Sequence, residues 1–65
     1  MLTDTELEVL ELLGHGKSSK EISRQIGLSS AEVNALGNSI RRKLKLKSSN
    51  ALIRYAVSWV EDSRK

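Results

Sequence analysis

The sequence predicts an all-α fold, a four-helix bundle, on three observations. A Ser or Thr is followed three residues later by Glu at three places, and this spacing is the capping box that begins many helices. Apolar residues recur every three or four positions, as they do on one face of a helix. The 65 residues include no Pro and no Cys, so nothing interrupts a helix and no disulfide staples the domain. The three boxes pair Thr3 with Glu6, Ser18 with Glu21, and Ser29 with Glu32.

Glycines and serines between these segments set the expected ends of the helices. Gly14 and Gly16 end the first helix, and Gly27 is placed to end the second in the left-handed conformation. Ser48 or Ser49 caps the fourth helix. We therefore expect one domain over residues 1–65, with helices at about 4–13, 19–26, 30–44 and 50–61.

The third expected helix, residues 30–44, has two contrasting faces. Its core-facing stripe includes Gly37, and a glycine inside a helix costs on the order of 1 kcal/mol relative to alanine. A close approach of a neighbouring helix is the plain reason to expect for that glycine. The opposite face has short side chains and a single cation, contributed by Ala31, Ala35, Asn38 and Arg42.

Charge is divided unevenly along the chain, although the net charge is only +3. Residues 1–16 carry four acidic and no basic residues among Asp, Glu, Lys and Arg, whereas residues 31–47 carry five basic residues and one acidic residue. A basic stretch of this kind is a usual electrostatic footprint for a polyanion. The alternative is a solvated helix face, since small basic patches are common.

Residues 19–26 and 30–44 are joined by the tight turn Gly27-Leu28-Ser29, which predicts a helix-turn-helix. Small outer side chains let its second helix enter the major groove of duplex DNA, where Asn34 and Asn38 reach base edges. An Asn side chain pairs best with adenine, through two hydrogen bonds. The basic residues beside that face neutralise phosphates, and the capped helix N-termini offer further N–H groups.

The fourth expected helix, residues 50–61, carries two apolar stripes side by side. Leu52, Tyr55, Ala56 and Trp59 form the first stripe. One stripe suffices to dock a helix, so the second suggests a partner surface. The alternative is that a small domain simply leaves some apolar residues exposed. The second stripe consists of Ile53, Val57 and Val60.

Several of these motifs, taken in register, resemble the LuxR-type (GerE/FixJ/NarL-like) DNA-binding domain. The resemblance covers essentially the whole chain. It implies that residues 19–44 form the DNA-reading unit, that the fourth helix is a homodimer surface, and that the protein is a bacterial transcription regulator. In that family the domain normally follows a phospho-acceptor receiver, as in two-component response regulators, or a ligand-binding domain. The motifs are Leu2-Thr3 with Glu6, Val9-Leu10, Gly16-Lys17-Ser18-Ser19-Lys20-Glu21-Ile22, Leu28-Ser29, Val33, Ile40, Lys43-Leu44 and Leu52 with Tyr55-Ala56.

Three departures from the family pattern weaken expected phosphate contacts. Glu32 stands where the family usually has Thr, Leu36-Gly37 where it usually has His and a basic or variable residue, and Ser48-Ser49 where it often has Ser-Arg. A helical protein–protein module that kept the fold but binds DNA weakly is therefore one alternative. A second alternative is promoter binding in the manner of sigma-factor region 4, which has a similar helix-turn-helix.

The residues and the resemblance together give a set of expected sites. The base-facing positions are Asn34, Ala35 and Asn38. The positions on the DNA backbone are Lys17, Ser18, Lys20, Arg41, Arg42, Lys43, Lys45 and Ser48. The dimer interface is assigned to Leu52, Ile53, Val57 and Val60. The expected partners are double-stranded DNA, a second copy of the chain and, through the family, RNA polymerase.

The composition excludes several other classes of function. With no Cys and one His, His15, the chain has no thiolate metal site and no catalytic pair, so we expect no enzyme, cofactor or metal. Glu8 and Glu11 are expected on a solvated face rather than at a metal. No apolar run approaches the roughly 20 residues of a membrane span, so we expect a cytoplasmic location. Met1 lies next to the first helix with no linker, which favours a domain excised from a longer protein.

Overall fold

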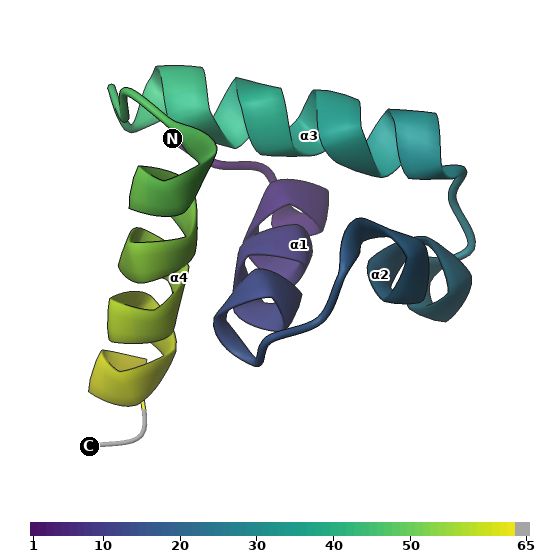
Figure 1. Ribbon diagram of the computed structural model, residues 1–65, viewed down its shortest axis with the longest axis horizontal. Coiled ribbons are helices and arrows are strands. Elements are labelled where there is room, and N and C mark those ends of the chain that lie inside the picture. Colours follow the sequence, from purple (N-terminus) through teal and green to yellow (C-terminus); the bar gives the residue numbers. More distant parts are fainter. Residues whose placement is uncertain (64–65) are drawn as a thin grey trace.

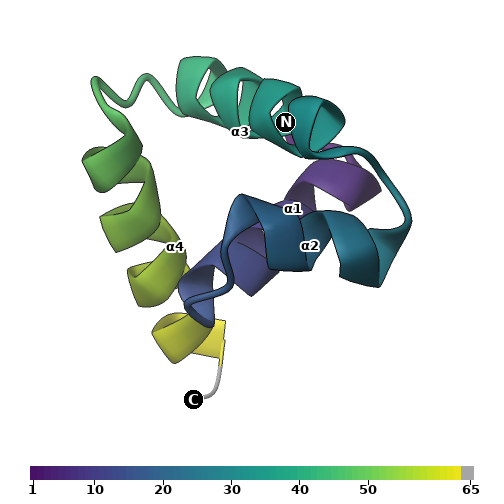
Figure 2. The ribbon, with the colours of Figure 1, turned by 45° about the vertical axis from the view of Figure 1, so that its right-hand side comes forward.

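The structure, a computed structural model, describes residues 1–63, and these form four helices. Across the described residues α3 spans the top of the molecule, with the other three helices beneath it (Figures 1 and 2). Helix α1 contacts all three others and lies between α2 and α4 (Figure 1). The helices are α1 (Asp4–Gly14), α2 (Ser19–Ile26), α3 (Ser30–Lys43) and α4 (Ser49–Ser63). The all-α prediction is therefore confirmed.

Each predicted capping box is present with both of its hydrogen bonds. At the start of α1, the Glu6 backbone N–H donates to Thr3 Oγ1 across 3.1 Å, and the Thr3 N–H donates back to Glu6 Oε1 across 2.8 Å. The boxes that begin α2 and α3 repeat this pattern. Helix α4 is capped by Ser48, whose hydroxyl accepts from the Ala51 N–H. The local sequence thus determines where every helix begins.

The core forms where the apolar stripes of the four helices meet around α1. Its most deeply buried side chains come from three helices and leave no surface to solvent. Burying an aliphatic side chain of this size contributes about 1.5–3 kcal/mol, so a few such residues carry much of the stability of a small domain. They are Val9 and Leu10 of α1, Ile22 of α2 and Ile40 of α3, with Ala56 of α4 beside them.

Gly14 is the last residue of α1, so the helix ends where the sequence predicted, but this glycine also has a packing role that the sequence did not indicate. The left-handed residue after α1 is Gly16, at φ 84°. A β-carbon at Gly14 would lie 2.5 Å from the carbonyl oxygen of Ala56 and 2.5 Å from Cγ2 of Val60. Gly14 is therefore required because α1 and α4 touch backbone to backbone there.

Gly37 does not mark a close helix contact, so the reason expected for it is wrong. A β-carbon at Gly37 would meet only Cδ2 of Leu52, at 3.9 Å, which is an ordinary van der Waals distance. The space beside Gly37 is instead part of a surface pocket between α3 and α4. The close helix approach that the sequence suggested for Gly37 is found at Gly14 instead.

Helix α3 is one residue shorter than expected and ends in a left-handed turn at Lys45, with φ 57°. The Leu46 N–H donates to the Arg41 carbonyl and the Lys45 N–H donates to the Arg42 carbonyl, as in a Schellman motif. This motif places Leu46 against the core and directs the chain into α4.

Candidate nucleic-acid interface

The outer face of α3 is exposed along its whole length, as the sequence predicted. Ala35 and Asn38 are exposed near its middle, and Ala31 and Arg42 extend the face toward its two ends. Apart from Arg42 at its end, this face carries only short side chains, so a partner can approach the helix backbone closely. A helix with this profile fits the major groove of duplex DNA, which is about 12 Å wide.

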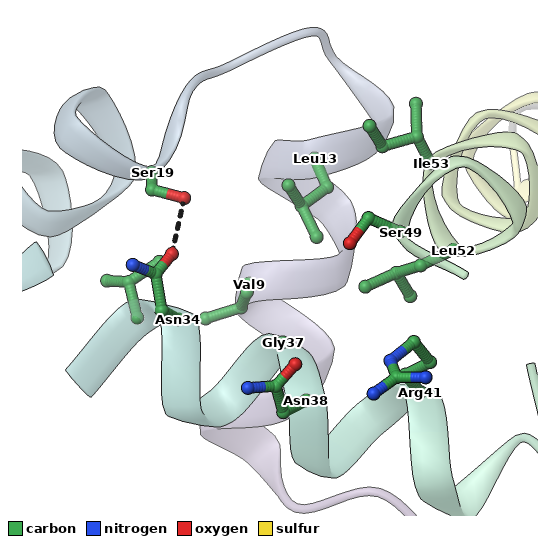
Figure 3. Close-up of a pocket in the computed structure, with 11 residues that line it drawn as sticks. Val9, Leu13, Ser19, Asn34, Gly37, Asn38, Arg41, Ser49, Leu52 and Ile53 are labelled. Carbon is green, nitrogen blue, oxygen red and sulfur yellow. Dashed lines mark hydrogen bonds between the residues drawn. The ribbon is translucent and has the colours of Figure 1, made fainter. Parts of the chain in front are cut away.

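Asn34, the third expected base-facing residue, is hydrogen-bonded to α2. The hydroxyl of Ser19, the first residue of α2, donates to Asn34 Oδ1 across 3.0 Å (Figure 3). This bond connects the two helices of the helix-turn-helix near the surface and fixes the side chain of Asn34. Spacing along the chain does not predict this bond, because the two residues lie 15 positions apart.

A pocket of about 330 Å³ opens between α3, the start of α4 and the start of α2 (Figure 3). Its floor is apolar and its rim is polar, with the Arg41 guanidinium as its only basic group among the lining residues. Arg41 Nη1 also donates to the Lys47 carbonyl across 3.5 Å, which holds it near the loop before α4. The lining consists of Val9, Leu13, Ser19, Val33, Asn34, Gly37, Asn38, Arg41, Ser49, Leu52 and Ile53.

Lys43 forms an ion pair within the chain. Its ammonium lies 2.6 Å from Oε1 of Glu6, whose side chain is only 3% exposed. Ser39 donates to the other carboxylate oxygen across 2.7 Å. These bonds, with the one from the Thr3 N–H, anchor α3 to the start of α1. The ion pair with Glu6 competes with a phosphate for the ammonium of Lys43, and the expected contact of Lys43 with the DNA backbone stays a prediction.

The same contacts shift the ionisation of Glu6. The hydrogen bond from Lys43, then those from the Thr3 backbone and from Ser39, lower the pKa of Glu6 from 4.5 to about 2. Each stabilises the carboxylate form, and together they outweigh the opposing effect of burial. The sequence identified Glu6 only as part of a capping box. Its second role depends on residues more than 30 positions away.

The other expected backbone contacts lie at the edges of the α3 face. Lys17, Ser18 and Lys20 are exposed at the start of α2, and Arg42 and Lys45 are exposed at the end of α3. The hydroxyls of Ser18 and Ser48 accept hydrogen bonds as helix caps, which leaves their O–H groups available to donate.

The four residues expected at a dimer interface divide into two pairs. Leu52 and Val60 are 6% and 7% exposed, because they pack into the core on the side of α4 that faces α1. They therefore have little surface to offer a second copy, which corrects their assignment. Ile53 and Val57 are 45% and 38% exposed, and Tyr55, two positions from each and so on another side of α4, is 39% exposed.

The structure also bears on the classes of function that the composition excluded. Within residues 1–63, no group of three or more His, Asp or Glu side chains is placed to hold a metal ion. No helix of the described residues has the length and apolar character needed to cross a bilayer. His15 lies on the surface with its Nε2 3.9 Å from Glu11.

Comparison with known proteins identifies the family. The family described as bacterial regulatory proteins, luxR family, matches residues 1–56, which is most of the chain. The chain belongs to this family. This match favours the LuxR type over the sigma-factor alternative, and its coverage includes the whole helix-turn-helix.

Two curated relatives share the luxR-type region of this chain. The transcriptional regulatory protein MctR of Rhizobium johnstonii is 36% identical over 56 residues, which are 86% of this chain and 26% of the relative. The transcriptional regulatory protein DesR of Bacillus subtilis is 43% identical over 47 residues, 72% of this chain and 24% of the relative. The luxR-type chain thus spans about a quarter of the length of these relatives. No solved structure matches it at a significant level.

Proposed function

We propose that this chain binds double-stranded DNA to regulate transcription, with α3 in the major groove. The observation that carries the proposal is the exposed outer face of α3, where short side chains and amides lie between cations. Asn34, Ala35 and Asn38 face bases in this arrangement. Lys17, Ser18, Lys20, Arg41, Arg42, Lys45 and Ser48 contact the DNA backbone, and Lys43 contributes less because Glu6 holds it.

The membership of the luxR family supports this proposal, and so do the names of the two relatives, both transcriptional regulators. Because the matched segments make up only 26% and 24% of those relatives, we propose that the chain is the DNA-binding part of a larger bacterial regulator. A cytoplasmic location, a response-regulator architecture and contact with RNA polymerase belong to the same proposal. Its chemistry is recognition, without an enzymatic step.

Titration of duplex DNA at several salt concentrations tests the proposal. Affinity must fall as salt rises, because neutralised phosphates release counterions. Arg42→Ala should reduce the slope of log K against log salt by about one charge. Arg54→Ala, which removes the same charge from an exposed position on α4, is the matched control and should change the slope less.

Lys43→Ala refines the same experiment. Because Lys43 is paired with Glu6 at 2.6 Å, its removal should lower stability and reduce the salt slope less than Arg42→Ala does. DNA binding with no salt dependence, or no binding at all, would contradict the proposed function and favour the protein–protein alternative. Glu32 in the first turn of α3 is the feature that supports that alternative, since its carboxylate repels phosphate.

We also propose that the chain forms a homodimer through α4. The support is the exposed pair Ile53 and Val57, which lie one turn apart on the same side of α4. Val57→Glu should abolish the dimer, because it places a charge in the centre of an apolar contact. Ser58→Glu, at the neighbouring exposed position, is the control. Sedimentation equilibrium measures both, and a wild-type chain that stays monomeric at millimolar concentration would contradict the proposal.

A further inference from the structure

The bond between Ser19 and Asn34 determines which edge of the Asn34 amide is available. Ser19 Oγ donates to Asn34 Oδ1 across 3.0 Å, so the carbonyl oxygen of the amide is turned toward α2 (Figure 3). The amide nitrogen points away from Ser19 in the same view. Asn34 is exposed and Ser19 is half-buried, so the bond leaves the nitrogen on the open side of α3.

This orientation changes what Asn34 can recognise in a base pair. An Asn side chain reads adenine with both of its polar atoms, because the oxygen accepts from N6 while the nitrogen donates to N7. With its oxygen directed to Ser19, Asn34 turns its amide nitrogen, a hydrogen-bond donor, toward the open side of α3. In the major groove guanine offers two acceptors, N7 and O6, whereas cytosine offers a donor. A fixed donor therefore favours guanine.

Asn38, one turn further along α3, is not restrained in this way. It is exposed, and among residues 1–63 its side chain has no hydrogen-bond partner. It lies between the pocket that Asn34 lines and a second hollow formed with Ala35, Ser39, Arg42 and Lys43. Its amide can turn either edge toward a base, so the two asparagines of the α3 face are not equivalent.

We propose that Ser19 is a positioning residue that fixes Asn34 as a hydrogen-bond donor and so selects guanine at the base that Asn34 reads. This inference rests on the proposed DNA binding. It assigns a role in sequence recognition to α2, through a residue that itself need not touch a base.

Selection from a random duplex library tests the inference with three variants. Asn34→Ala identifies the base position that Asn34 reads, because that position alone loses its preference. Ser19→Ala should release the amide oxygen and shift that position from guanine toward adenine, changing the ratio of the two bases about tenfold. Ser19→Thr, which keeps the hydroxyl, should keep the preference for guanine. Ser58→Ala on α4 should leave the selected sequence unchanged.

A second measurement needs no DNA. In the free domain, three-bond couplings that report the χ1 angle of Asn34 should show one rotamer in the wild type and in Ser19→Thr, and averaging in Ser19→Ala. A role of Ser19 in stability alone would lower the melting temperature without either effect.

The outcomes separate the two proposals. A wild-type domain that enriches no sequence overturns both the DNA-binding function and the role of Ser19. Suppose instead that the wild-type domain enriches a sequence and that Ser19→Ala enriches the same base at the Asn34 position. That result overturns the role of Ser19 alone.

Discussion

Two glycines belong to helices of this domain, and their surroundings are opposite. At Gly14 in α1, a β-carbon would collide with the Ala56 carbonyl and with Val60, each at 2.5 Å. At Gly37 in α3, a β-carbon would meet only Leu52, at 3.9 Å. The contact between α1 and α4 is thus packed to the backbone, whereas the junction of α3 and α4 keeps an open pocket. The two contacts of α4 therefore differ in how closely the helices approach, and a substitution at each glycine tests that difference.

The largest effect in this comparison is expected at the packed glycine. Gly14→Ala should lower the free energy of unfolding by about 1–3 kcal/mol, because overpacking forces backbone shifts against Ala56. This net loss already allows for the higher helix propensity of alanine, which by itself would add up to about 1 kcal/mol of stability. Urea denaturation followed by circular dichroism measures the change. A variant as stable as the wild type would show that α1 and α4 are not in direct backbone contact.

The opposite sign is expected at the open glycine. Gly37→Ala should raise the free energy of unfolding by up to about 1 kcal/mol, because alanine favours the helix and the new methyl group has ordinary space. The same denaturation experiment measures it, so each glycine variant is the control for the other. A loss of stability at both positions would contradict the difference between the two regions.

The contrast between the two glycines shows what a sequence can and cannot predict. The helix-turn-helix and the three capping boxes depend on residues a few positions apart, so local chemistry determines them. The periodicity also places Asn38 and Arg42 on an outer face. It does not give the distance between two helices, and that distance decides whether Gly14 or Gly37 is needed for packing.

The same limit explains the residues of the site that sequence reasoning missed. Lys43 belongs to a basic run and looks like a phosphate contact, yet Glu6, 37 positions earlier, neutralises it. Ser19 looks like an ordinary first residue of α2, yet it holds Asn34. Leu52 and Val60 come from two different apolar stripes of α4 and were both expected at a dimer interface, and only the packing of α4 shows that they are buried. Each of these findings concerns a contact between two helices, and the spacing of residues along one helix does not predict such a contact.

The smallest change in stability over the ordinary pH range is expected from the ionisation of Glu6, which lies at the other end of α1 and bonds to α3. The pKa of Glu6 is lowered from 4.5 to about 2 in the folded domain, first of all by Lys43. The unfolded chain therefore takes up a proton at a higher pH than the folded one, so acid favours unfolding. Stability should stay nearly constant down to about pH 5 and then fall as the pH drops toward 2.

Glu6→Gln isolates the contribution of this carboxyl to the acid transition. Gln at that position keeps the hydrogen bond back to Thr3 but cannot pair with the charge of Lys43. The variant should be less stable than the wild type at neutral pH, and the difference should shrink as the pH falls from 4.5 to 2. Glu21 also has a lowered pKa, chiefly through the Ser18 backbone N–H, so some acid dependence remains in the variant. Urea denaturation at a series of pH values measures both curves. Parallel curves would mean that Glu6 is not ionised against Lys43 in the folded domain.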